Sequence, residues 1–284
     1  MTELHGLAPR YRRIFDSASP FLVTHRGNLS RLDLSPLGWE IAESARWDPS
    51  SLSSQGFVDR LDRLDSLAFG GQGMRMPRWV FYDCGSFPGI VFGFSLPGSA
   101  LPPSLRDAFG VEEAARELMV PISMWVAIPC AESGAWFGHN LSSANGVGSD
   151  FRMAGLGTLT KALGIALTRL DTQYGATQWS SLSLGLHLTF GPLQLVSAYT
   201  PAHTHPRTFT YRVCPNEVSL KKCLQGEKVN TLWEGERSVD IEDDDELIVL
   251  QREIEAENGW DLVGVERSDR ETRGLLNRRR PRTR

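Results

Sequence analysis

The stretch Arg152–Leu170, RMAGLGTLTKALGIALTRL, decides the fold. It opens with two glycines, Gly155 and Gly157, and continues into apolar residues that recur every three or four positions. That spacing predicts an amphipathic helix over residues 154–170. Glycines let a backbone approach a ligand closely, and the N–H groups of a first helical turn attract an anion. A pyrophosphate is the ligand that this pattern favours.

Two well-known phosphate-binding patterns do not fit the stretch. A P-loop needs Gly-Lys followed by Ser or Thr, which does not follow Gly157 here. A dinucleotide fingerprint needs a further glycine before the pair, and that position is also unfilled. The loop is therefore of another kind.

The flanking segments indicate an α/β (α+β) fold with a mixed sheet. Apolar runs at 121–129 and 135–143, joined by a short turn, predict a hairpin before the loop. After the helix, the pattern predicts a strand at 176–180, a short helix at 182–190 and strands at 193–200 and 208–213. Strands that alternate with helices in this way predict a sheet with helices on its faces.

The rest of the chain yields coarser expectations. Residues 1–30 lack periodicity and are interpreted as an N-terminal arm. Helical spacing appears over residues 57–67 and again over 104–118, whereas 78–83 and 89–96 suggest a second hairpin. Residues 217–284 form a C-terminal extension that contains a possible strand at 247–253 and ends in a basic tail, 278–284.

The amino-acid composition limits the partners and locations to be expected. The 284 residues carry a formal net charge of −4, which gives no overall attraction to nucleic acid or anionic membranes. The four cysteines show no zinc spacing and no metal site is expected. Neither a signal peptide nor a membrane span is apparent, so a cytoplasmic location is the default expectation.

The motif resembles the Arg/Gln-x-x-Gly-x-Gly/Ala signature of the GNAT superfamily of acyl-CoA N-acyltransferases, with Arg152, Gly155 and Gly157 in its three fixed positions. In that family the motif lies between the fourth strand and a long helix, followed by a strand, a short helix and two strands. The order predicted over 135–213 is similar. The loop over 145–151 is longer than the family's usual connection.

The resemblance implies a GNAT-like core over residues 31–216 with a splayed central sheet flanked by helices, and acetyl-CoA or another acyl-CoA as cofactor. The pyrophosphate would bind the segment Arg152, Met153, Ala154, Gly155, Leu156, Gly157 and Thr158. The strand end at Leu141, Ser142 and Ser143 would bind the pantetheine arm.

Three residues are candidates for proton transfer. The family often has a tyrosine four residues before the glycine that ends the short helix, as general acid for the departing thiolate. His187 holds that position here, and an imidazole titrates near neutral pH. A packed core histidine is an equally good interpretation of it. His139 on the predicted strand and Glu132 in the preceding turn are candidates to accept the amine proton.

Three functions remain open. The first is acyl transfer from coenzyme A to a small-molecule or macromolecular amine by direct attack. The second is DNA base modification of the Mom type, by a GNAT-like protein whose basic tail, 278–284, contacts nucleic acid. The third is a catalytically silent GNAT-like module that binds a partner protein. The sequence names neither the acceptor nor the oligomeric state.

Overall fold

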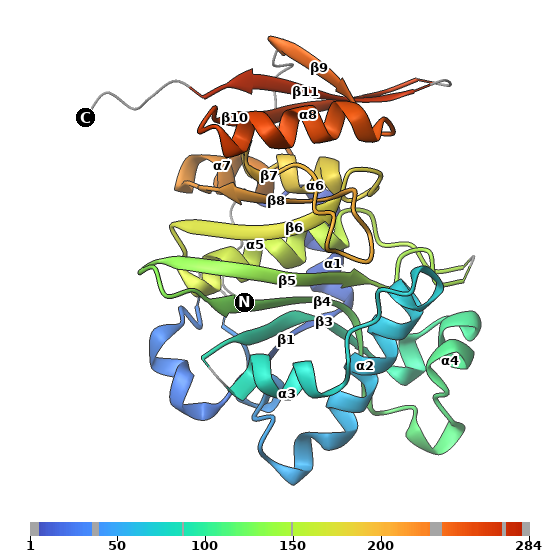
Figure 1. The fold of residues 1–284 in the computed structure, drawn as a ribbon. Helices are drawn as coiled ribbons and strands as arrows, with labels where there is room; N and C mark the ends of the chain where they lie inside the picture. Colours follow the sequence, from blue (N-terminus) through green and yellow to red (C-terminus); the bar gives the residue numbers. More distant parts are fainter. Residues whose placement is uncertain are drawn as a thin grey trace. The chain divides into compact units, whose positions relative to one another are not determined.

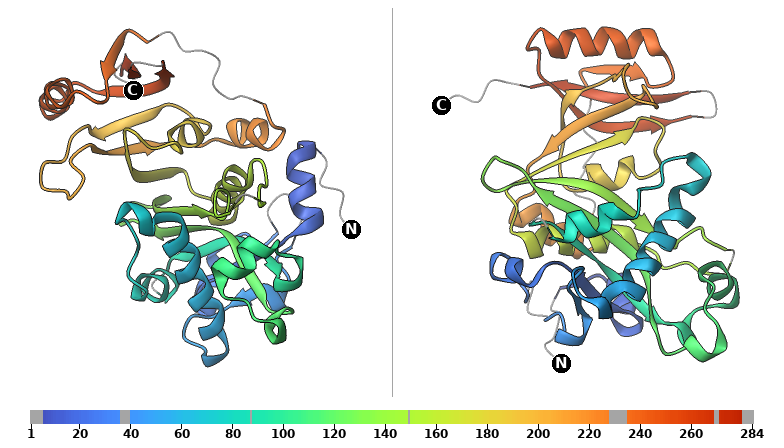
Figure 2. Two further views of the ribbon diagram at one scale, coloured as in Figure 1. Left: turned by 90° about the vertical axis from the view of Figure 1, so that its right-hand side faces the viewer. Right: turned by 60° about the horizontal axis from the view of Figure 1, so that its bottom comes forward.

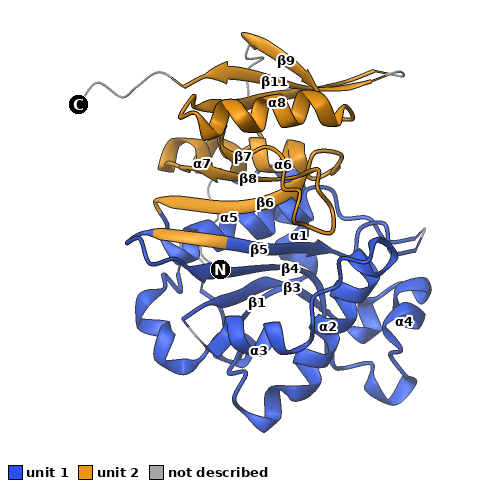
Figure 3. Cartoon of the chain, in the orientation of Figure 1, with its two compact units in different colours: residues 1–134, 138–170 blue, residues 135–137, 171–284 orange. Residues whose placement is uncertain are grey.

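The computed structural model describes residues 6–35, 40–86, 88–148, 150–227, 235–268 and 271–279. The chain divides into two compact units (Figure 3). Unit 1 contains residues 1–134 and 138–170, and unit 2 contains residues 135–137 and 171–284. Both are built of strands with helices packed on them (Figure 1), which confirms the mixed α/β class.

Unit 1 is built on a mixed sheet. Its strands are β1 (Ser19–Val23), β2 (Arg46–Trp47), β3 (Ile90–Pro97), β4 (Met119–Pro129) and β5 (Ala135–Ser143), in the order β2-β1-β3-β4-β5. β1 runs parallel to β2 and antiparallel to β3, and β3 runs antiparallel to β4. Nearly every residue of β3 and β4 is buried, because helices cover both faces of the sheet.

The helices of unit 1 are α1 (Pro9–Ser17), α2 (Gln55–Phe69), α3 (Trp79–Ser86), α4 (Pro103–Phe109) and α5 (Leu156–Thr168). α2 and α5 lie on opposite faces of the sheet (Figure 2). α5 is buried almost all round, and its Thr160 Oγ1 lies 2.7 Å from Ser123 Oγ of β4. Lys161, which the helical pattern places off the apolar face, is also fully buried.

Unit 2 is built on antiparallel strands. They are β6 (Thr172–Gln178), β7 (Leu193–Ser197), β8 (Thr208–Val213), β9 (Arg237–Asp240), β10 (Trp260–Arg267) and β11 (Thr272–Arg278). Within the unit their order is β6-β8-β7-β10-β11-β9, and each neighbouring pair in this order is antiparallel. The helices are α6 (Leu184–Leu188), α7 (Glu217–Leu224) and α8 (Asp244–Glu255).

The N-terminal segment is not a loose arm over its described part. α1 begins at Pro9, a residue suited to the first turn of a helix, and buries Tyr11 and Ile14. β1 then pairs with both β2 and β3, with Leu22 opposite Phe92. Residues 6–23 therefore belong to unit 1.

The expected strand at 78–83 is wrong, because these residues form helix α3. Its buried positions are Val80, Phe81, Cys84 and Gly85, a spacing of one helical turn. Short apolar runs do not distinguish a strand from a buried helix by periodicity alone. The neighbouring expectation at 89–96 is confirmed as β3.

The C-terminal extension is more structured than expected. It contributes α7, α8 and three of the strands of unit 2, and the expected strand at 247–253 lies inside helix α8. The Asp243 side chain accepts hydrogen bonds from the N–H groups of Asp245 and Glu246, which caps the helix. Leu247 and Leu250, one turn apart, are its buried residues.

Within the described part of the chain, no helix combines the length and apolarity needed to cross a bilayer.

Removing the α8 cap should destabilise unit 2. Asp243→Ala leaves two N–H groups without their acceptor, at 2.8 and 3.3 Å, and should lower the free energy of unfolding by about 1 kcal/mol. Asp243→Asn keeps an acceptor and should stay close to wild type. Urea unfolding of the three proteins measures the difference. Equal stability of the alanine and asparagine variants would contradict the cap.

Candidate functional site

The N-terminus of α5 presents several free hydrogen-bond donors. Gly155 is the N-cap residue, with a φ of +84°. Among the described residues, none accepts a hydrogen bond from the N–H groups of Ala154, Gly155, Gly157 or Thr158. The aligned peptide dipoles of the helix add partial positive charge at the same end. This end of α5 is therefore suited to an anion.

The fold itself requires glycine at position 155. Its backbone is in the left-handed region, and a Cβ there would lie 2.7 Å from Cε1 of the buried Tyr11. The side chain that lies against Gly155 is thus the Tyr11 ring of α1. The space beside the Gly155 Cα is filled by Tyr11 and is not open to a ligand, which corrects the expectation at this position.

Two exposed arginines accompany the free donors. Arg152, from the motif, is exposed three residues before Gly155. Arg10 of α1 is also exposed, and its Nε lies 3.4 Å from the position that a Cβ on Gly155 would take. Arg10 could not be predicted from the sequence because it lies far from the motif along the chain. Its position one residue before a buried tyrosine gave no signal.

The long loop before α5 is fixed by side chains. The Asn145 amide accepts a hydrogen bond from the Met153 N–H and donates one to the Met153 carbonyl, each at 2.8 Å. The Asp150 carboxylate accepts a hydrogen bond from the Ser104 hydroxyl of α4. The Met153 N–H is thereby occupied, so this predicted cofactor-binding residue offers no free N–H donor.

The predicted pantetheine strand is the end of β5. The Leu141 N–H donates to the Asn140 side chain at 2.9 Å, and the Ser143 hydroxyl accepts from the Asn145 N–H at 3.1 Å. Ser142 is 1% exposed, and its hydroxyl has no hydrogen-bond partner in the described structure. A buried hydroxyl without a partner is costly, which makes Ser142 the residue of this strand that best suits a ligand.

The two candidates for proton acceptance differ in position. His139 is exposed on β5, two residues before Leu141, and desolvation by nearby protein atoms lowers its pKa. Glu132 is exposed in the turn before β5. At ~3.3 Å per residue, the strand separates it from Leu141 by roughly 20 Å. The structure therefore does not bring Glu132 together with Leu141, Ser142 and Ser143.

A buried carboxyl group lies against the same strand. Asp65 of α2 is fully buried and accepts hydrogen bonds at 2.6 Å from the Met76 N–H and from the Asn140 amide. Its pKa is raised to about 6, chiefly by burial, against the hydrogen bond from Met76 and with a smaller rise from the charge of Asp62. Asp65 follows Leu61 by four residues, a helical spacing that could have indicated its burial.

His187 lies in unit 2, on α6. It is half-buried, and its Nδ1 lies 3.0 Å from the Tyr211 hydroxyl of β8. Its Nε2 lies 3.4 Å from the Ser183 hydroxyl. The histidine thus has polar contacts on both ring nitrogens and is not a purely apolar core residue.

The basic tail is only partly described. Arg278 lies 5.5 Å above the Trp260 ring, and Arg279 forms an ion pair with Asp261 at 3.0 Å. Both contacts fix these arginines to unit 2. Residues 280–284 lie outside the described part, so nucleic-acid binding by the tail stays a prediction.

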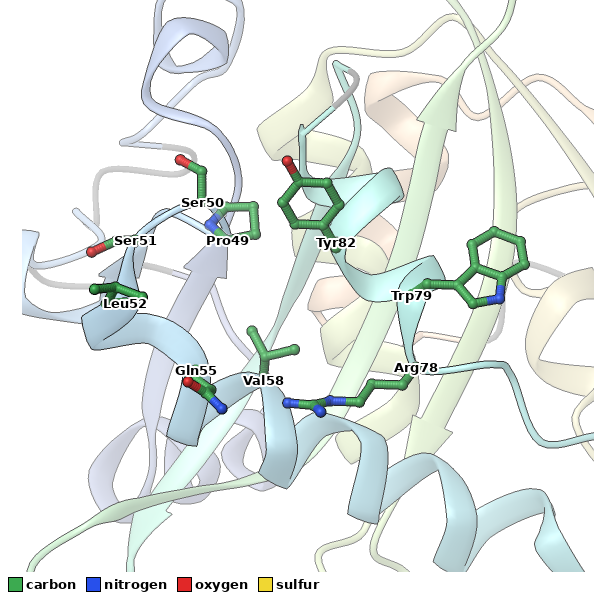
Figure 4. Close-up of a pocket in the computed structure, with 9 residues that line it drawn as sticks. All are labelled: Pro49, Ser50, Ser51, Leu52, Gln55, Val58, Arg78, Trp79 and Tyr82. Carbon is green, nitrogen blue, oxygen red and sulfur yellow. The ribbon is translucent and has the colours of Figure 1, made fainter.

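Unit 1 also carries an open pocket of about 530 Å³ between α2, α3 and the loop before α2 (Figure 4). Its lining includes Leu52, Trp79 and Tyr82, which are 91%, 63% and 47% exposed. This pocket was not predicted from the sequence, because Trp79 and Tyr82 were expected in a strand. The pocket shares no residue with β5 or the α5 N-terminus, so it is a separate feature.

No protein-family model and no curated protein matches the chain. Among solved structures, it is similar to the NatC complex bound to Gag peptide and CoA, with 11% identity and a TM-score of 0.41 over 60% of this chain and 97% of that one. It is similar to nourseothricin acetyltransferase, with 7% identity and a TM-score of 0.30 over 45% and 66%.

A further similar structure is a protein assigned as an acyl-CoA N-acyltransferase from Klebsiella pneumoniae subsp. pneumoniae, with 11% identity and a TM-score of 0.32 over 59% of this chain and 93% of that one. All three belong to the GNAT acyl-CoA N-acyltransferases, the superfamily that the Arg152 motif resembles.

The Asp65 carboxyl should make stability depend on pH. Its pKa is raised from 3.8 to about 6 in the fold, so between these values only the folded state holds the proton. The stability that Asp65 contributes is therefore highest at low pH, and it falls by ~3 kcal/mol as the pH rises through 6. Between pH 4 and 7, the unfolding free energy of wild type should therefore fall relative to that of Asp65→Asn.

Urea unfolding at several pH values measures this difference. The matched control is Asp107→Asn, which removes an exposed carboxyl of α4 and should follow wild type across the range. Parallel curves for wild type and Asp65→Asn would show that Asp65 ionises normally in the fold.

Proposed function

We propose that this protein is an acyl-CoA-dependent N-acyltransferase that transfers an acetyl or other acyl group to an amine by direct attack. The observation that supports it most is the α5 N-terminus, where free N–H groups lie beside Arg10 and Arg152. The chain order β5, loop, α5, β6, α6, β7, β8 also follows the order of the GNAT motif region.

The residues at α5 fit the pyrophosphate of coenzyme A. In this proposal the N–H groups of Ala154, Gly155, Gly157 and Thr158 donate to phosphate oxygens, since they have no other described acceptor. Arg152, and Arg10, whose Nε lies near Gly155, add charge-assisted hydrogen bonds. When bound, acyl-CoA supplies the thioester.

The pantetheine contact and the two proton-transfer roles are assigned from the chemistry of the side chains. The Ser142 hydroxyl, buried and without a described partner, donates to the pantetheine arm at the end of β5. The amine must lose a proton when it attacks, and His139 on the same strand is the candidate acceptor, because its lowered pKa keeps it neutral. His187 protonates the departing thiolate.

The cofactor assignment predicts that coenzyme A binds the wild-type protein in calorimetry. Arg152→Glu should weaken binding at least ~10-fold, since it replaces an attractive charge with a repulsive one. Arg152 is exposed, so the fold should be unaffected. Arg31→Glu, an equal charge change at another exposed arginine, is the control and should bind like wild type.

No binding by wild type would refute the cofactor assignment and favour the silent binding module. Undiminished binding by Arg152→Glu would show that the cofactor binds away from the α5 N-terminus. Gly155→Trp is less informative, because the substitution would also displace Tyr11.

The acid role predicts a kinetic effect at His187. His187→Ala should lower kcat by roughly 10²- to 10⁴-fold, with little change in coenzyme A affinity. His187→Tyr places the family's usual acid at this position and should retain substantial activity, whereas His187→Phe should be folded and inactive. Thiol release from acyl-CoA with a panel of amines measures kcat. An active phenylalanine variant would remove His187 from the mechanism.

A further inference from the structure

The side chain of Asn140 links helix α2 to the end of strand β5 within unit 1. Its Nδ2 donates to Asp65 Oδ1 at 2.6 Å, and its Oδ1 accepts from the Leu141 N–H at 2.9 Å. Asp65 and Asn140 are 75 residues apart in the sequence. One amide group therefore joins a carboxylate of α2 to a backbone N–H group of β5.

The groups on either side of this amide allow it only one orientation. A backbone N–H can only donate, so the amide atom that faces Leu141 must be the oxygen. The amide nitrogen then faces Asp65, whose oxygen accepts from it. The other Asp65 oxygen accepts from the Met76 N–H at 2.6 Å, which holds the carboxylate from a second side. A flipped amide would place two donors together at Leu141 and two acceptors together at Asp65.

The contact between Asn140 and Asp65 is costly to weaken. Asp65 is fully buried, and with a pKa of about 6 its carboxyl group is ionised at neutral pH. A ligand that took the Leu141 N–H would have to move the Asn140 amide away from this buried charge. It would replace one neutral hydrogen bond by another and weaken a charge-assisted one, so the exchange is unfavourable.

The Leu141 N–H would otherwise be available at one edge of β5. The Ala144 N–H donates to the Ile122 carbonyl of β4 at 2.8 Å. N–H groups alternate between the two edges of a strand, so that of Leu141, three residues earlier, points away from β4. It is one of the backbone donors of the strand end that was predicted to bind pantetheine.

We propose that Asp65 is a positioning residue, which holds Asn140 over the Leu141 N–H and so keeps this donor from the pantetheine arm. The cofactor then contacts this strand end through the Ser142 hydroxyl, which is buried and has no described partner. The consequence for the cofactor rests on the proposed acyltransferase function. The hydrogen bonds among Asp65, Asn140 and Leu141 do not depend on it.

Amide hydrogen exchange, followed by NMR on the full chain at neutral pH, tests these hydrogen bonds without ligand. Asn140→Ala removes the acceptor of the Leu141 N–H and should speed exchange at Leu141 at least ~10-fold. The Met76 contact of Asp65 is unchanged, and residue 140 is only half-buried, so the variant should fold. Asn258→Ala, which removes an exposed amide without a described hydrogen bond of its own, is the control and should exchange like wild type at Leu141.

A double variant tests the role of Asp65 in particular. Asp65→Asn/Asn140→Asp exchanges the amide and the carboxylate between α2 and β5. The amide on α2 can then accept from Met76 and donate to the carboxylate on β5, which still accepts from Leu141. The double variant should therefore exchange like wild type at Leu141. Exchange as fast as in Asn140→Ala would overturn the role of Asp65, and wild-type exchange in Asn140→Ala would overturn the whole proposal.

Coenzyme A binding connects the hydrogen bonds to the proposed function. In calorimetry, Asn140→Ala should bind coenzyme A about 5-fold more tightly than wild type, because the released Leu141 N–H adds one hydrogen bond to the pantetheine arm. A merely structural role of Asn140 predicts equal or weaker binding, and either result would overturn the consequence for the cofactor. Absence of binding by both proteins would instead refute the cofactor assignment and leave the exchange result intact.

Discussion

The contact between Gly155 and Tyr11 fixes where α5 begins. Gly155 turns into the left-handed region, and the Tyr11 ring fills the space beside it. Any other residue at 155 would meet backbone strain and a steric clash together. The helix that starts there is buried against β4, so this turn sets both the packing of α5 and the direction in which its first N–H groups point. A constraint of the fold thus creates the proposed anion site.

The loop before this turn extends the same arrangement. Asn145 binds both the N–H and the carbonyl group of Met153, and the free N–H donors that follow are those of Ala154, Gly155, Gly157 and Thr158. The loop is longer than the connection usual in the GNAT superfamily, and the Asn145 amide links its two ends by binding Met153. Arg10 joins the site through α1, because α1 is the helix that packs on Gly155. Packing and charge are therefore supplied by the same helix.

Periodicity in the sequence predicted the elements that are long or strongly patterned. α2, α5, β4 and β5 were found within a few residues of their bounds, because each carries a sustained spacing of apolar residues. α3 and α8 were misinterpreted as strands, since a short apolar run does not reveal its period. The capping side chain of Asp243 is a local signal that could have indicated a helix at α8.

The site was predictable only where it is local in sequence. Arg152, Gly155 and Gly157 form a compact motif, so their grouping could be read directly. Arg10, Asp65 and the Tyr211–His187 pair are brought together by tertiary contacts between distant segments, which a single sequence does not encode in its spacing. Glu132 shows the converse case, because it is near Leu141 in sequence while an extended strand lies between them.

The central claim is that the α5 N-terminus binds the pyrophosphate of coenzyme A. Backbone amide NMR tests it most directly, by comparing titrations with coenzyme A and with pantetheine, which lacks the pyrophosphate. The account predicts large shifts of the Ala154, Gly155, Gly157 and Thr158 amide signals with coenzyme A and almost none with pantetheine. Shifts confined to other parts of the chain, or equal shifts at these four amides with both ligands, would contradict it.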